Sequence, residues 1–321
     1  MEKTIDVIAV GELLMDFTTV GQSAQGNEVF EACPGGAPSN VLSILNKIGL
    51  KTGFIGKVGA DQFGSLLRCV LDEIGVDTSN LATDPEVKTT LAFVHTGPGG
   101  ERDFSFYRNP GADMMLSEED IDPDYIRKAR ALHFGSLSMT HDTVRKATLK
   151  ALETAKKDGM LISFDPNLRP PLWNSLDNAK KQIETGLSYC DVLKISDNEV
   201  EFLTGETDYD KGIAKLREQY DIPLIFLTLG PNGSRAYYKN LQVNAPGIAV
   251  DSIEATGAGD TFCGTALSRV LELGLDNLNE ESLLETLQLA NAAAAIVTTR
   301  KGAIRSMPEV SEVHALHAKS Y

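Results

Sequence analysis

The stretch ATGAGDTFCG, Ala255–Gly264, joins a glycine-rich turn to the apolar spacing of a helix. Gly257 and Gly259 allow unusual backbone dihedrals, so the N–H groups of Ala258, Gly259 and Asp260 can point at one place. The positive end of the helix dipole adds to this, and the stretch predicts an anion site. A carboxylate beside an anion site is unfavourable unless it has a function. We interpret Asp260 as the general base of a phosphoryl transfer. For this motif alone, a glycine-rich turn in which Asp260 only caps the helix is an equally good interpretation.

Composition restricts the class of protein. With 321 residues and 42% hydrophobic content, the chain can bury a full core, and its alternating strand and helix patterns indicate one large α/β domain over residues 1–321. The net charge of −15 argues against nucleic acid and anionic membranes as partners, because both require a basic face. The four cysteines are widely spaced, without a CxxC pair or a nearby His cluster, so we expect reduced thiols rather than a zinc site or disulfides.

The order of apolar patterns predicts the fold. The N-terminus leads directly into an apolar strand, Ile5–Val10, and no apolar run approaches a membrane span, so we expect a cytoplasmic protein. Strand and helix patterns alternate regularly from 132 to 195, which predicts a three-layer, doubly wound, mostly parallel sheet. Two β-rich segments, about 17–33 and 88–112, are too exposed in pattern for that sheet. They predict a small β-sheet flap, with a hairpin turn at Thr96–Gly100.

Candidate substrate contacts follow the first strand. That strand ends at Gly11, and the carboxyl end of a buried parallel strand opens toward a ligand crevice. Asp16 comes just after it and is either a turn residue or an acceptor for sugar hydroxyls. Gly35 and Gly36 precede a Pro-Ser helix start, so a small ligand can approach the backbone there. Asn40, in the first turn of that helix, can face the same crevice.

Together these motifs resemble one family. The strand ending in Gly-Glu, Asp16 five residues past that glycine, GGAPSN at 35–40 and ATGAGD at 255–260 are similar to the ribokinase-like sugar kinases, also called PfkB carbohydrate kinases. The resemblance runs through the whole chain and implies the ribokinase-like fold, with ATP and Mg²⁺. The run ERDFSFYRNPGADMML, 101–116, is especially like fructokinases, whereas DPNLRPPLW, 165–173, resembles a run that fructokinases share with 2-keto-3-deoxygluconate kinases.

The resemblance implies roles for single residues on the sugar side. Gly257, Ala258 and Gly259 would form an anion hole beside the base Asp260. Residues from several motifs would orient the sugar: Asp16, Gly35, Gly36, Asn40, Arg108, Asn167 and Arg169. Either of the two arginines could instead bind the carboxylate of a keto acid, which leaves the acceptor open.

The same resemblance places the nucleotide in the C-terminal half of the chain. The implied contacts are Lys194, Thr228, Gly230, Gly233 and Asn291. Glu199 matches the acidic residue that orients magnesium-bound water in the family. Ser196 stands where the family has Asn, so the resemblance does not extend to that residue's metal contact.

A monovalent cation site is also implied, with K⁺ as the expected ion. It would lie behind the anion hole, where carbonyl groups point away from the phosphate, and would be held by Glu254, Gly302 and Ser306. Glu254 is one methylene longer than the Asp usual in the family. The site could therefore be altered, bind more weakly, or be replaced by a side-chain contact.

The resulting prediction is an ATP-dependent sugar kinase that converts D-fructose to fructose 6-phosphate. Three alternatives remain: a 2-keto-3-deoxygluconate kinase, a kinase for a ribose- or nucleoside-like acceptor, and a catalytically inactive sugar-kinase-like binding protein. The intact loop with Asp260 argues against the last. Because a small sheet needs its apolar face covered, and flaps of relatives often pair between subunits, we expect a homodimer through the flap.

Overall fold

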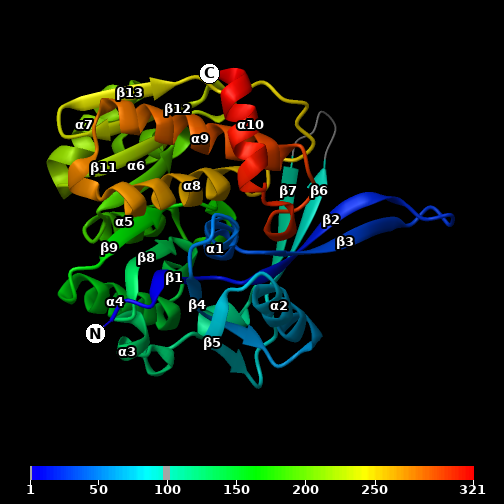
Figure 1. Ribbon diagram of the computed structural model, residues 1–321. Coiled ribbons are helices and arrows are strands. Elements are labelled where there is room, and N and C mark those ends of the chain that lie inside the picture. The colour runs from blue at the N-terminus through cyan, green and yellow to red at the C-terminus, as the bar shows by residue number, and fades with distance from the viewer. Residues whose placement is uncertain (1, 97–101) are drawn as a thin grey trace.

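A nine-stranded sheet forms the centre of the molecule (Figure 1). This computed structural model describes residues 2–96 and 102–321. In spatial order the strands are β13 (Leu241–Ala245), β12 (Ser234–Tyr238), β11 (Leu224–Thr228), β10 (Val192–Ser196), β9 (Leu161–Asp165), β8 (Ala129–Gly135), β1 (Ile5–Val10), β4 (Thr52–Gly59) and β5 (Asp77–Asp84). In this order, neighbouring strands from β11 to β5 pair in parallel, and β12 is antiparallel to both of its neighbours.

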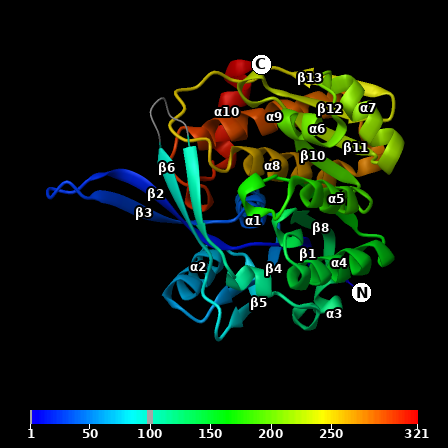
Figure 2. The ribbon, with the colours of Figure 1, turned by 180° about the vertical axis from the view of Figure 1, so that it is seen from behind.

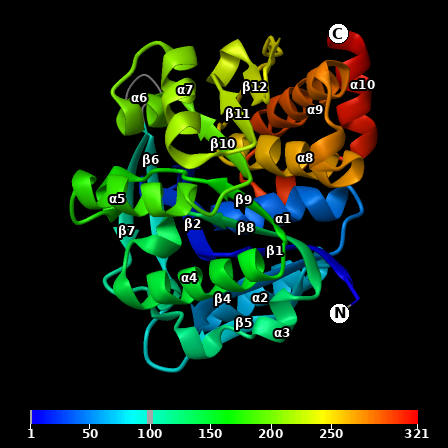
Figure 3. The ribbon, with the colours of Figure 1, turned by 90° about the vertical axis from the view of Figure 1, so that its left-hand side faces the viewer.

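Helices cover both faces of this sheet (Figure 3). The strands are continuous apolar runs because both of their faces are buried, as in β1, where Val7–Val10 are fully inaccessible. One face packs against α3 (Pro123–Ile126), α4 (Asp142–Lys157), α5 (Leu176–Leu187), α6 (Asp197–Thr204) and α7 (Tyr209–Tyr220). The other packs against α1 (Ala37–Lys47), α2 (Gln62–Glu73), α8 (Ala258–Leu273) and α9 (Glu280–Thr298), with α10 (Val310–Ser320) packed outside α9. The predicted three-layer, mostly parallel architecture is confirmed.

A second, four-stranded sheet projects from the body of the molecule (Figures 1 and 2). Its order is β3 (Glu28–Gly35), β2 (Leu14–Gln22), β6 (Leu91–Thr96) and β7 (Arg102–Tyr107). We call these four strands the flap. It is the predicted small sheet, although β2 begins at Leu14 and β3 extends to Gly35, beyond the predicted limits of 17–33. The predicted turn at Thr96–Gly100 falls on 97–101, outside the described residues.

The strand order reverses beside β1, because the chain runs from β1 to β4 and β5 on one side and later returns to β8 on the other. Ligands of open α/β sheets bind at such a reversal, outside the carboxyl ends of the strands. Polar residues gather at these ends: Glu12 follows β1, Asp165 ends β9, Ser196 ends β10 and Thr228 ends β11. The fold therefore brings together side chains that the sequence separates widely.

Two further expectations concern membrane spans and thiols. In the part of the chain that the structure describes, no helix is both long enough and apolar enough to cross a membrane. The four cysteines are free thiols, as expected, and two of them, Cys190 and Cys263, are buried.

Candidate active site

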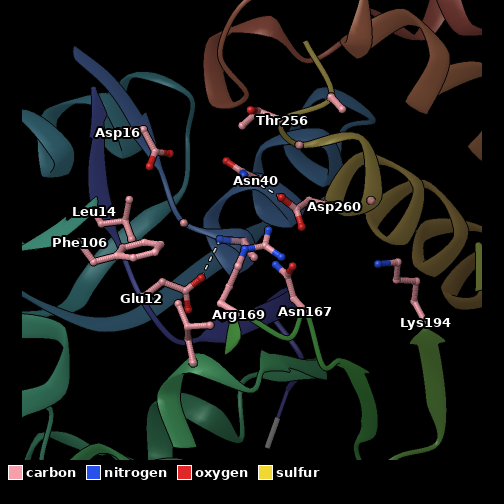
Figure 4. Close-up of a pocket in the computed structure, with 16 residues that line it drawn as sticks. Glu12, Leu14, Asp16, Asn40, Phe106, Asn167, Arg169, Lys194, Thr256 and Asp260 are labelled. Carbon is pink, nitrogen blue, oxygen red and sulfur yellow. Dashed lines mark hydrogen bonds between the residues drawn. The ribbon is translucent and has the colours of Figure 1, made fainter. Parts of the chain in front are cut away.

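Two pockets lie at the carboxyl ends of the strands, and they share a boundary. The first lies under the flap (Figure 4), and we call it the flap pocket; its lining includes Glu12, Leu14, Asp16, Gly36, Ala37, Asn40, Phe106, Leu137, Thr256, Gly257 and Asp260. The second, the outer pocket, is lined among others by Ser196, Glu199, Thr228, Gly230, Gly233, Ala258 and Asn291. Four residues line both pockets: Asn167, Arg169, Lys194 and Gly259.

The loop before α8 has the backbone that the sequence predicts. Gly257 adopts φ 78°, a left-handed conformation that favours glycine, and α8 begins at Ala258. Among the described residues, the N–H groups of Gly259 and Asp260 donate to no protein acceptor, as at the start of most helices. The N–H of Ala258 differs from the prediction, because it donates to the carbonyl of Ala255 at 3.3 Å. The loop thus offers two free donors beside a carboxylate rather than three.

Asp260 lies in the first turn of α8 and is only 7% exposed. The Asn40 Nδ2 donates to its Oδ2 at 2.8 Å, across 220 residues of sequence. Burial, and then the nearby Asp165 carboxylate, raise the pKa of Asp260 to about 6. The carboxylate is therefore held in one orientation and remains ionised near neutral pH, as a proton acceptor must be.

Two more carboxylates face the flap pocket. Burial raises the pKa of Asp16 to about 7, against an opposing effect of Arg169. Burial also raises the pKa of Glu12 to about 7. Glu12 Oε1 accepts from the N–H of Ala37 at 2.8 Å, at the start of α1, while its Oε2 is buried without a partner among the described residues. The Oδ1 of Asn40 is likewise buried and unpartnered, so this pocket holds acceptors that a ligand hydroxyl could satisfy.

The two adjacent glycines contribute in different ways. Gly36 lines the flap pocket with φ 125°, and a side chain there would collide with the carbonyl of Glu12. Gly35 does not line the pocket, but a Cβ at that position would collide with the carboxylate of Asp16. Glycine at 36 thus exposes backbone to the pocket, and glycine at 35 leaves room for the carboxylate.

Arg108, predicted to contact the sugar, lies outside the lining of both pockets. It is 8% exposed. Its Nε donates to Asp113 at 2.8 Å, and its Nη atoms bond Thr140 at 2.9 Å and the carbonyl of Leu137 at 3.2 Å. The guanidinium forms a buried ion pair with Asp113 that ties the end of β7 to the body, beside the pocket residue Leu137. The contact between Arg108 and the sugar stays a prediction, which this geometry does not support.

The outer pocket brings together the residues predicted for the nucleotide, with Lys194, Thr228, Gly230, Gly233 and Asn291 in its lining. The amide of Asn291 already has protein partners, since it accepts from Ser234 at 2.9 Å and donates to the carbonyl of Pro246 at 3.1 Å. Its side chain therefore holds the wall of this pocket in place and has little hydrogen-bonding capacity left for a ligand.

Glu199 and Ser196 bond each other at the start of α6. Glu199 Oε2 accepts from the hydroxyl of Ser196 at 2.8 Å and from its N–H at 2.9 Å, a reciprocal cap at the start of α6. Glu199 Oε1 accepts from the N–H of Leu168 at 2.7 Å. Serine in place of the family Asn is thus a helix cap.

From its described side chains alone, the outer pocket does not form a metal site. Within 2–96 and 102–321 there is no cluster of three metal-ligating His, Cys, Asp or Glu side chains. A single carboxylate such as Glu199 fits a magnesium ion that is bound mainly by nucleotide phosphates and water, not one enclosed by protein ligands.

The residues predicted for a monovalent cation join two loops. Glu254 is 6% exposed, accepts from the hydroxyl of Thr256 at 2.5 Å and from the N–H of Gly302 at 3.2 Å. The hydroxyl of Ser306 donates to the carbonyl of Lys301. The Glu254 carboxylate thus connects the segment before α8 to the loop after α9.

Two site residues were missed by sequence reasoning. Glu12 was seen only as part of the strand-end motif, and Asp165 only as the first letter of DPNLRPPLW. Each lies at the carboxyl end of a buried parallel strand, Glu12 after β1 at the order reversal and Asp165 at the end of β9, and that position was the available signal. Asp165 forms a buried ion pair with Lys194, whose Nζ lies 3.1 Å from its Oδ2.

The fold and this pair of pockets define a phosphotransferase with a hydroxyl acceptor, and the chain belongs to the pfkB family of carbohydrate kinases, which it matches over residues 4–310. It is 41% identical to probable fructokinase-4 of Arabidopsis thaliana, over 98% of this chain and 97% of that protein. Fructokinase of Xylella fastidiosa with bound ATP superposes with a TM-score of 0.90 at 32% identity, covering 99% of each chain. A double mutant of fructokinase from Vibrio cholerae O395, in fructose, ADP and potassium ion bound form, gives a TM-score of 0.88 at 31% identity, covering 98% and 99%.

Proposed function

We propose that this protein is a fructokinase that transfers the γ-phosphoryl group of ATP to O6 of D-fructose. One observation carries the proposal: Asp260, oriented by Asn40, lines the flap pocket from the same helical turn that carries the free N–H groups of Gly259 and Asp260. A sugar in the flap pocket and a nucleotide in the outer pocket would meet at this carboxylate. The named relatives are fructokinases, which agrees with that acceptor.

The transfer follows from these positions. The O6 hydroxyl gives its proton to Asp260 while its oxygen forms a bond to the γ-phosphorus, and the bond from that phosphorus to the β-γ bridging oxygen breaks. The N–H groups of Gly259 and Asp260 stabilise the charge that develops on the transferred group. Bound magnesium would neutralise phosphate charge, and Glu199, which lines the outer pocket, would orient its water.

Charge in the flap pocket favours a neutral acceptor. Three carboxylates line it, those of Glu12, Asp16 and Asp260. Of the cations that line it, Lys194 lies at the boundary with the outer pocket, on the side of the phosphates, so Arg169 is left to meet an anionic group of the acceptor. A 2-keto-3-deoxygluconate carboxylate would therefore enter an acidic pocket that lacks the second guanidinium, Arg108. Hydroxyls, in contrast, can donate to the carboxylates.

A coupled ADP assay with a panel of acceptors tests this proposal. We expect the highest kcat/KM with D-fructose, and lower values with 2-keto-3-deoxygluconate, ribose and nucleosides. A much higher kcat/KM with 2-keto-3-deoxygluconate would show that the acceptor is wrong while leaving the kinase assignment intact. No turnover with any acceptor would favour the inactive binding protein.

A homodimer through the flap is part of the proposal. The face of the flap opposite Asp16 carries aromatic side chains: Phe17 stacks on Phe93 with centroids 4.8 Å apart, and Tyr107, 5.4 Å from Phe93, is 67% exposed. Such a sheet is stabilised when a second copy covers it. We expect a dimer in sedimentation velocity at micromolar concentration, and a fully active monomer would exclude this assembly. The cytoplasmic location remains a prediction from the sequence.

A further inference from the structure

Lys194 and Asp165 form a buried ion pair beneath the two pockets. Lys194 is 6% exposed and Asp165 is 2% exposed. The ammonium nitrogen lies 3.2 Å from Oδ1 and 3.1 Å from Oδ2 of Asp165. Because the residues belong to the neighbouring parallel strands β9 and β10, the sheet fixes the distance between them.

The ammonium of this pair lies where a phosphoryl group would cross from donor to acceptor. Lys194 lines both the flap pocket and the outer pocket. A Cβ built on Gly259 would lie only 3.0 Å from its Nζ, so the ammonium approaches the loop that carries the free N–H groups. Asp260 is the next residue. An unrestrained ammonium at this place would have the catalytic carboxylate as an alternative partner.

From this geometry, and resting on the proposed kinase function, we propose that Asp165 is a positioning residue for phosphoryl transfer. It holds the Lys194 ammonium at the boundary of the pockets and keeps it from pairing with Asp260. The ammonium then faces the transferred phosphoryl group, and Asp260 stays available to accept the proton. Asp165 touches neither reactant and acts through Lys194.

The charges around the two groups agree with this arrangement. Burial alone would lower the pKa of Lys194, but Asp165 and then Glu199 outweigh burial and raise that pKa above its usual range. The lysine is therefore a permanent cation. The pKa of Asp260 is raised by burial and then by Asp165, and lowered by Asn40, Lys194 and Arg169. The groups around Asp260 come from five places: Asp16 on β2, Asn40 on α1, Asp165 on β9 with Arg169 after it, Lys194 on β10, and Cys263 on α8.

The variant Asp165→Asn removes the negative charge of the side chain and keeps its shape. Asp165 Oδ1 also accepts from the N–H of Asn167 at 3.2 Å, and an asparagine keeps that acceptor, so the loop with Asn167 and Arg169 is retained. We expect kcat to fall by roughly 10²-fold, because a misplaced charge at the reacting centre costs about that much. We also expect the acid limb of kcat/KM to move to lower pH, since loss of the Asp165 charge and closer approach of Lys194 both lower the pKa of Asp260. An acid limb that stayed in place would contradict this role of Asp165, and the cycle with Lys194 separates positioning from the direct effect of the charge.

A double-mutant cycle tests whether Asp165 acts through Lys194. In a Lys194→Met background, adding Asp165→Asn should change kcat by less than about twofold, because the group that it positions is gone. Independent effects that multiply would overturn the proposal, as would wild-type kcat in Asp165→Asn. The double variant leaves no unpaired buried charge, so it remains informative if a single variant folds poorly. The matched control is Asp210→Asn, a surface carboxylate paired with Arg235 at 2.8 Å, which should leave both kcat and the acid limb unchanged.

The outcome is separable from that of the proposed function. If the wild-type protein phosphorylates a sugar other than fructose, the proposed acceptor is wrong and the same cycle on that sugar still decides the role of Asp165. If the wild-type protein turns over and Asp165→Asn matches it, only the role of Asp165 is wrong. If the wild-type protein phosphorylates no sugar, both proposals are overturned.

Discussion

The flap pocket and the outer pocket meet at Lys194 and Gly259, yet they are built from different chemistry. The flap pocket presents the carboxylates of Glu12, Asp16 and Asp260, whose pKa values are all raised, first of all by burial. The outer pocket presents glycine backbone at Gly230, Gly233 and Gly259, and the amide of Asn291 that lines it is bonded within the protein.

The difference teaches how one site handles two reactants. A hydroxylated acceptor must give up a proton, so carboxylates in a desolvated place are useful there. A phosphorylated donor needs N–H groups and close backbone approach, which glycine supplies. Changes in the flap pocket should therefore affect chemistry and its pH dependence, while nucleotide binding is expected to survive them.

The largest expected effect is that of Asp260→Asn. The variant keeps the shape of the side chain but cannot take the proton, so kcat should fall by roughly 10² to 10⁴. Nucleotide affinity, measured by titration calorimetry with ADP, should be close to that of the wild type because the outer pocket is intact. Near-wild-type turnover at saturating sugar would contradict the contrast between the two pockets, because the Asp260 carboxylate would then not be the proton acceptor.

The second-largest expected effect is on the pH dependence of kcat/KM, which the carboxylates of the flap pocket should set and the outer pocket should not. Burial raises the pKa of Asp260 to about 6 and that of Asp16 to about 7. Both groups act in the ionised form, so kcat/KM should fall as the pH decreases through 7 and 6. Each group should contribute about a tenfold decrease for every pH unit below its own pKa. Sugar-dependent rates between pH 5 and 9 measure this, with ADP affinity as the control. A kcat/KM that stays constant down to pH 5 would contradict the assignment of these carboxylates.

The smallest expected effect concerns the loop behind both pockets. A potassium ion there would satisfy carbonyls that point away from the free N–H groups and hold the loop in its active shape. We predict a several-fold higher kcat in potassium chloride than in tetramethylammonium chloride at equal ionic strength. Glu254→Ala should abolish the difference, because Glu254 joins the two loops through Thr256 and Gly302. Equal wild-type rates in the two salts would mean that the carboxylate orders the loop without a cation.

Local sequence patterns determined the elements and the centre of the site. The apolar run Ile5–Val10 predicted a buried strand, and it is one. The glycines and the helix spacing of Ala255–Gly264 predicted a turn that opens a helix with Asp260 in its first turn, as observed. These features depend on dihedral preference and side-chain period, which neighbouring residues set by themselves.

Only the tertiary structure decided how distant side chains pair. Arg108 follows a flap strand like a ligand contact, but Asp113 and Thr140 consume its guanidinium inside the protein. Asn40 reaches Asp260 across 220 residues, and Asp165 neutralises Lys194 between adjacent strands. Each pairing depends on strand order and on the depth of burial, because a charge removed from water must take whichever partner the packing places beside it. A linear pattern carries neither distance nor depth, so it located the catalytic loop and left the partners of its charges to the fold.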